Sequence, residues 1–179
     1  MPSWPDTRPD GVSIEELPIE QIDELVPVWN SLREHHLTLA PSWFPAPYDA
    51  AESWQRRARQ YRAWLCEPDS FVLAARHDHQ LIGYAMVHLR DGSPTWPFSE
   101  RAGELETLAV LREKRGRGVG RALLKAARDR LRALGAREIS LHLLVGNQSA
   151  GRFYDRQGFR PFATWLTSSL REDGESRHM

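Results

Sequence analysis

The feature that most constrains the fold is a strand, a glycine-rich loop, a helix and a second strand in succession between residues 104 and 145. Residues 104–110 (ELETLAV) and 137–145 (REISLHLLV) are apolar segments of strand length. Residues 119–134 between them carry Leu123, Ala127 and Leu131 at helical spacing, and a glycine follows. Because a helix of about sixteen residues joins the two strands, they are expected to pair in parallel.

The remaining segments predict further elements around this unit. In chain order they are a strand at 12–16, a helix at 18–36 that Pro27 kinks or splits, a helix at 48–65, a hairpin at 71–90, a helix at 148–157 between Asn147 and Gly158, and a final strand at 159–170. The order of these elements predicts a mixed sheet flanked by helices.

Length and composition favour one domain over residues 1–179, with a core from about 12 to 170 and polar, frayed ends. A single cysteine, Cys66, excludes a disulfide within the chain and favours a cytoplasmic protein. We expect no secretory signal and no membrane segment, because no charged-then-apolar leader or long apolar run is present. The net charge of zero gives no general attraction to nucleic acid or membranes.

The charge is nevertheless uneven. Residues 112–132 hold nine lysines or arginines and two acids, around Gly116, Gly118 and Gly120. Taken alone, such a run also fits a solvated helix face. A glycine loop before a helix N-terminus is, however, a natural anion site, because bare N–H groups can approach the ligand. A P-loop is excluded by Arg121 and Ala122 after the last glycine, and the glycine spacing does not fit the dinucleotide-binding fingerprint.

The spacing Arg115-x-x-Gly118-x-Gly120 fits [QR]-x-x-G-x-[GA] and resembles the pyrophosphate-binding motif of the GNAT superfamily of acyl-CoA-dependent N-acyltransferases. ELETLAV resembles the fourth strand of that family, and residues 147–159 (NQSAGRFYDRQGF) resemble its N-x-x-A-x-x-[FL]-Y-x-x-x-G-F segment. With the hairpin, the similarity covers residues 71–159. It implies an α/β (α+β) fold with a mixed, mostly antiparallel sheet of six to seven strands, a central splayed parallel pair, and helices on both faces.

The resemblance implies acetyl-CoA as cosubstrate and no metal. Pantetheine would run between the splayed strands, and the loop would hold the pyrophosphate. Lys125 and the surplus arginines would surround the 3′-phosphate. The residues expected to bind the cofactor are Leu108, Ala109, Val110, Arg115, Gly116, Arg117, Gly118, Val119, Gly120, Arg121, Asn147 and Tyr154.

Acetyl transfer from a thioester to an amine needs a neutral amine, stabilisation of an oxyanion and a proton for the thiolate. By the resemblance Tyr154 is the candidate general acid, since a phenol is protonated at neutral pH. Glu104 is the candidate general base, directly or through a water. Glu106 competes with it, because both share a face of a regular strand unless a bulge intervenes. His142 in the next strand is a third candidate base.

The acceptor pocket of the family lies between the first two helices and the loop before the fourth strand. The residues expected there are His35, His36, Trp43, Phe44, Trp96 and Phe98, with Glu106 and His142 beside them. Aromatic packing against the core is the alternative role for the aromatic members. We expect a small-molecule or protein amine as acceptor and no nucleic acid or membrane partner, and a homodimer remains open. Two rival functions are a non-catalytic acyl-CoA sensor and a nucleic-acid-binding module that uses the basic helix.

Overall fold

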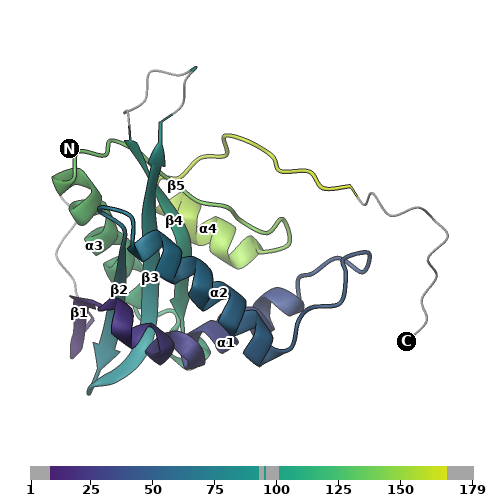
Figure 1. Cartoon of the computed structure of the whole chain (residues 1–179), viewed down its shortest axis with the longest axis horizontal. Coiled ribbons are helices and arrows are strands. Elements are labelled where there is room, and N and C mark those ends of the chain that lie inside the picture. The colour runs from purple at the N-terminus through teal and green to yellow at the C-terminus, as the bar shows by residue number, and fades with distance from the viewer. Residues whose placement is uncertain (1–8, 93–94, 96–100, 169–179) are drawn as a thin grey trace.

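The computed structural model describes residues 9–92, 95 and 101–168 of the chain. The strands are β1 (Val12–Glu16), β2 (Phe71–His77), β3 (Gln80–Asp91), β4 (Arg101–Val110) and β5 (Ile139–Ser140). The helices are η1 (Ile19–Leu25), α1 (Val26–Leu37), α2 (Ala50–Leu65), η2 (Arg112–Lys114), α3 (Val119–Ala133) and α4 (Gln148–Arg156). Helices α1 and α2 cover one face of the sheet and α3 covers the other (Figure 1).

The sheet has the order β1-β2-β3-β4-β5, and its first four strands are antiparallel. Strand β5 runs parallel to β4 through Gly103 opposite Ile139 and Glu104 opposite Ser140. This parallel pair confirms the unit predicted from the loop and the helix. Between β3 and β4 the register shifts, because Leu105 and Thr107 face consecutive residues of β3 and Glu106 is the extra residue of a bulge.

Local sequence explains where the helices begin. Pro27 lies in the first turn of α1, so the predicted helix over 18–36 is split into η1 and α1. Asp49 caps α2 by accepting a hydrogen bond from the Glu52 N–H at 2.8 Å. Asn147 caps α4 in the same way through the Ala150 N–H at 3.2 Å, as its sequence position predicts.

The buried residues form one hydrophobic cluster that joins both helical layers to the sheet. On one face, Leu131 of α3 packs so closely over Gly103 that a Cβ there would lie 2.5 Å from it. On the other face, the buried Tyr61 hydroxyl of α2 bonds to the Thr107 hydroxyl at 2.5 Å and to the Tyr84 hydroxyl at 3.2 Å. Strand β4 is therefore fixed from both sides.

Two of the predicted strands differ from the structure: one is shorter than predicted, and the other does not form in the described part of its range. The strand expected over 137–145 is limited to Ile139–Ser140, because the chain leaves β4 beyond that point. The final strand expected over 159–170 does not form at 159–168, where nearly every residue is exposed, and the rest lies outside the described residues. The described sheet thus has five strands rather than six to seven, and its parallel pair lies at the edge rather than at the centre.

Candidate functional site

The glycine loop connects β4 to the first turn of α3. Gly116 and Gly118 have φ angles of 76° and 87°, a left-handed conformation that glycine adopts without strain. The first intrahelical bond runs from the Ala122 N–H to the Gly118 carbonyl at 3.0 Å. The N–H groups of residues 119–121 consequently have no partner inside the helix, and the positive end of the helix dipole lies in this loop.

The space around the loop suits a large anion. A Cβ on Gly116 would meet no heavy atom within 4 Å, so the loop is open at that point. A Cβ on Gly120 would lie 3.7 Å from Phe153 and 3.8 Å from Val110. The first turn of α3, the end of β4 and helix α4 therefore meet at Gly120.

The basic residues of this stretch divide into two groups. Those on the later turns of α3 already have protein partners: Lys125 and Arg132 bind Asp129, Arg130 binds Glu16, and Arg128 donates to the Gln157 carbonyl. In the loop, burial lowers the pKa of Arg115, which donates to the Val110 carbonyl at 2.9 Å. Lys114 and Arg117 line a cavity of about 230 Å³ beside the loop.

The edge of β4 that leads to this loop is open. Strand β5 pairs with β4 only at Gly103 and Glu104, and residues 105–110 have no strand partner on that side among the described residues. The two parallel strands therefore diverge, which is the splay that the sequence resemblance implied. An extended ligand with amide groups could pair with this edge as an added strand.

Helix α4 lies beside the open edge and carries Tyr154 (Figure 1). The Tyr154 ring contacts the rings of Phe153 and Phe159 at centroid distances of 5.1 and 5.3 Å. Burial raises the pKa of Tyr154 to about 12, so its phenol is protonated at neutral pH. Gly158 follows the helix with a φ of 84°, as expected for a glycine just past a helix C-terminus.

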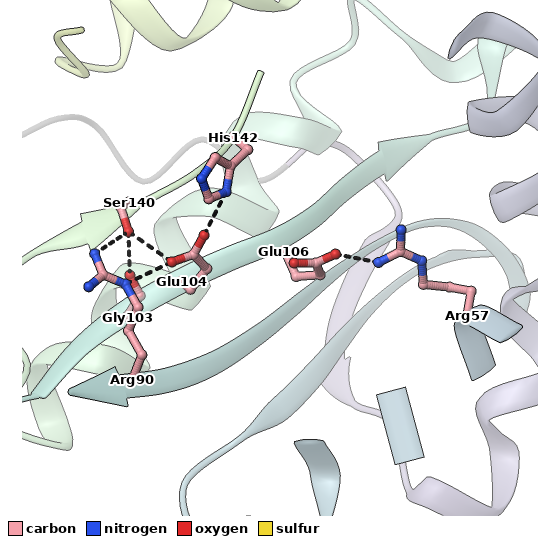
Figure 2. Close-up of polar contacts among 7 residues, drawn as sticks. All are labelled: Arg57, Arg90, Gly103, Glu104, Glu106, Ser140 and His142. Atoms are coloured by element: carbon pink, nitrogen blue, oxygen red, sulfur yellow. Dashed lines mark hydrogen bonds and ion pairs between the residues drawn. The ribbon is translucent and has the colours of Figure 1, made fainter. Parts of the chain in front are cut away.

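The Glu104 side chain is buried, and its carboxylate oxygens contact only polar side chains in the described part of the chain. Its Oε2 accepts from Arg90 Nε at 2.8 Å and from the Ser140 hydroxyl at 3.3 Å, and its Oε1 lies 2.9 Å from His142 Nδ1. The His142 side chain is 69% exposed, and its ring contacts the exposed Trp165 ring at a centroid distance of 5.6 Å. Figure 2 shows Glu104 held between its three polar partners. A buried carboxylate is thus connected to an exposed imidazole.

Glu106, the extra residue of the β4 bulge, points to a different partner. Its carboxylate forms an ion pair with Arg57 of α2 (Figure 2). The Arg57 guanidinium also lies 5.0 Å from the Trp29 ring centroid and 5.6 Å from that of Tyr61. Both candidate bases of β4 are therefore paired with an arginine, Glu104 with Arg90 and Glu106 with Arg57, and Glu104 contacts His142 in addition.

A cavity of about 260 Å³ lies between α1 and α2. The side chains that characterise it are Trp29, Arg33 and His36 from α1 and Ser53, Arg57 and Gln60 from α2. Burial, and then the charges of His35 and two arginines, lower the pKa of His36, so this imidazole is neutral at pH 7. Through Arg57 the cavity reaches Glu106 on β4.

The predicted acceptor residues are only partly brought together. His36 lines the cavity, whereas its neighbour His35 does not. Trp43 and Phe44 contact each other at 5.2 Å but are 62% and 52% exposed and lie outside the cavity lining. Trp96 and Phe98 lie outside the described residues.

Several residues of the site were missed from the sequence. Arg33, Arg57 and Trp29 line the cavity, and Arg90 and Ser140 bind Glu104. A signal for the first group was present. The cavity residues recur at i, i+4 and i+7 on each of the two helices, so each helix presents a polar stripe beside its apolar face.

Two further features bear on the class of protein. Within the described residues, no helix has the length and apolar character needed to cross a membrane. In the same residues no three His, Cys, Asp or Glu side chains are grouped so that they could hold a metal ion.

Comparison with known proteins gives a consistent result. The profile of the acetyltransferase (GNAT) family matches residues 29–159. The chain is 27% identical over 158 residues to the mycothiol acetyltransferase of Propionibacterium freudenreichii subsp. shermanii, covering 87% of this chain and 45% of that protein. It is 29% identical over 138 residues to an uncharacterized N-acetyltransferase of Mycobacterium tuberculosis, covering 77% and 82%. The chain spans less than half the length of the mycothiol acetyltransferases that it matches.

Solved structures show the same fold. An aminoglycoside N-acetyltransferase in complex with CoA superposes with a TM-score of 0.66 at 19% identity, covering 89% of this chain and 95% of that one. The architecture predicted from the sequence is thereby confirmed, although the number of strands differs.

Proposed function

The chain belongs to the acetyltransferase (GNAT) family, and we propose that it transfers an acetyl group from acetyl-CoA to a primary amine. One observation carries the proposal: the open edge of β4 ends in a glycine loop at the positive end of α3, and Tyr154 lies on the helix beside it. The relatives differ in the acceptors that their names give, so the family alone does not define the acceptor.

The residues present fit acetyl-CoA, which supplies the acetyl group as a thioester. The N–H groups of residues 119–121 would bind the pyrophosphate, and Lys114 and Arg117 beside the loop would bind the remaining phosphate. Backbone groups of residues 108–110 would pair with the pantetheine amides and stabilise charge on the acetyl carbonyl. Asn147, as the cap of α4, would fix that helix against the site.

Tyr154 is proposed as the acid that donates to the departing sulfur. Its pKa of about 12 keeps the proton in place, but a free thiol titrates near ~8.5. Full transfer to a thiolate would therefore be uphill by roughly 5 kcal/mol in the surroundings of the free protein. We infer that Tyr154 donates a hydrogen bond to the sulfur as the bond breaks, and that the proton released by the amine completes the transfer.

Each of the two carboxylates is paired with an arginine, but Glu104 also contacts the exposed His142 imidazole, so Glu104 rather than Glu106 is proposed as the base. Both oxygens of Glu104 have partners, and His142 lies on the oxygen that Arg90 leaves open. The amine proton would reach Glu104 directly, through a water, or through the outer nitrogen of His142. In the last case Glu104 orients the imidazole and stabilises it when charged.

The test combines binding with turnover. Acetyl-CoA should raise the Tm of the protein, and release of free thiol should follow addition of an amine acceptor. Tyr154→Phe should keep the shift in Tm and lower kcat by about 100-fold or more, as expected for loss of a general acid. Unchanged kcat would remove Tyr154 from the mechanism. Binding of acetyl-CoA without turnover across a broad amine panel would indicate a sensor instead.

A further inference from the structure

The cavity between α1 and α2 carries a net positive charge. Arg33 and Arg57 line it, and no aspartate or glutamate does among the residues that the structure describes. Arg57 is neutralised by Glu106, and His36 is neutral at pH 7. Arg33 donates to the carbonyl oxygen of Tyr48, which carries no full charge. Within the described part of the chain, the cavity wall therefore has one positive charge without an acidic partner, at Arg33.

The guanidinium groups of Arg33 and Arg57 are held in place by contacts that leave several of their N–H donors unused in the described part of the chain. Tyr48 fixes one nitrogen of Arg33, and Trp29, Tyr61 and Glu106 fix Arg57. Each arginine has five N–H donors, and fewer than half are used within the described part of the chain. The remaining donors suit a planar anion such as a carboxylate.

The size and position of the cavity limit what it can hold. Its volume of about 260 Å³ is below the ~300–1,000 Å³ typical of sites for drug-sized ligands, so it suits a small group. Arg57 connects it to Glu106 in the bulge of β4, two residues from Glu104. A ligand with its anionic end at Arg33 would extend its other end toward the strand where acetyl transfer is proposed.

Resting on the proposed function, we propose that the acceptor is a small amine that also carries a carboxylate, and that Arg33 binds this carboxylate. An acceptor with several positive charges and no carboxylate is disfavoured here, because it would meet Arg33 without a balancing acid. Arg33 thus determines specificity, whereas Tyr154 and Glu104 perform the chemistry.

The experiment measures acceptor binding separately from turnover. Calorimetry in saturating CoA would compare β-alanine, γ-aminobutyrate and L-phenylalanine with the carboxamide of each, which has the same shape and no negative charge. We expect the best carboxylate to bind about tenfold or more tightly than its amide. Arg33→Gln should reduce this ratio to about one. Arg59→Gln, which removes one charge from an exposed position on α2, should leave it unchanged.

Equal binding of carboxylates and amides would overturn the inference, as would a preference that survives in Arg33→Gln. Weaker binding of CoA in Arg33→Gln, with acceptor binding unaltered, would assign the cavity to the donor and also overturn it. Failure of the proposed function is a separate result: acetyl-CoA would neither raise the Tm nor release thiol, whatever the carboxylate preference.

Discussion

Gly118→Ala should reduce both the stability of the protein and its affinity for acetyl-CoA. The φ of Gly118 is 87°, and a residue with a Cβ loses about 1–2 kcal/mol in this conformation. The new Cβ itself has room, since its nearest neighbour is the Pro9 side chain at 3.5 Å. The strain alone should lower the Tm by about 2–8 °C.

The effect on binding follows from the same strain. The chain can relieve it by moving φ toward negative values, which turns the N–H groups at the start of α3 away from the phosphate position. Losing one hydrogen bond to a charged group costs about 1.5–3 kcal/mol, or roughly 10- to 150-fold in Kd. Acetyl-CoA at about 100 times the wild-type Kd stabilises the wild type by ~2.7 kcal/mol. The same concentration should stabilise the variant by only about 0.3–1.4 kcal/mol.

The assay is thermal unfolding with and without acetyl-CoA, and Gly120→Ala is the matched control. Gly120 lies in helical conformation, and its added Cβ would make ordinary contacts at 3.7 Å and beyond. This control should keep its Tm and the full acetyl-CoA shift. A full shift in Gly118→Ala would refute the assignment of the loop, and loss of the shift in Gly120→Ala as well would show that an added methyl group, rather than the φ angle of Gly118, weakens binding.

Two further predictions concern stability. Because the pKa of Tyr154 is about 12 when folded and near ~10 when unfolded, its contribution is complete below pH 10 and is lost as the pH rises to 12. Between pH 10 and pH 12 the free energy of unfolding should fall by up to about 2.7 kcal/mol more in the wild type than in Tyr154→Phe. Urea unfolding at each pH measures this difference. The same pH dependence in both proteins would contradict the burial of this phenol. Gly103→Ala should lower the free energy of unfolding, measured with urea, by about 1–3 kcal/mol, because its Cβ would lie 2.5 Å from the buried Leu131. An unchanged free energy of unfolding would mean that α3 packs differently on β4.

The parts predicted well from the sequence are those with local causes. Asn147 accepts from an N–H three residues ahead, and Gly158 supplies a left-handed φ just past the end of the same helix. The apolar period of α3 places Leu123 and Leu131 in the core, whatever lies on the other side of the sheet. Such features need only neighbours within a few residues, so a sequence pattern determines them.

The parts predicted poorly depend on distant partners. Residues 141–145 have strand-like composition, but a strand also needs a paired neighbour, and the divergence from β4 removes it. The ion pair between Arg57 and Glu106 joins residues 49 positions apart, and no pattern near either one indicates it. Arg90 and Glu104 come from adjacent strands whose register depends on the bulge. These contacts follow from tertiary packing, and they determine the surroundings of the two candidate bases.

The placement of charge around β4 also bears on how an amine would become a nucleophile. A site that recognised the ammonium with a free carboxylate would raise the ammonium pKa and oppose loss of its proton. Here Glu106, which is paired with the cavity residue Arg57, is neutralised by it, and Arg33 adds positive charge. Anchoring the acceptor by its carboxylate requires no free carboxylate of the cavity to bind the ammonium, so recognition does not raise the ammonium pKa. In the proposed mechanism, the negative charge of the acceptor is used for recognition, and the positive charge of its ammonium is removed by proton transfer to Glu104 or His142.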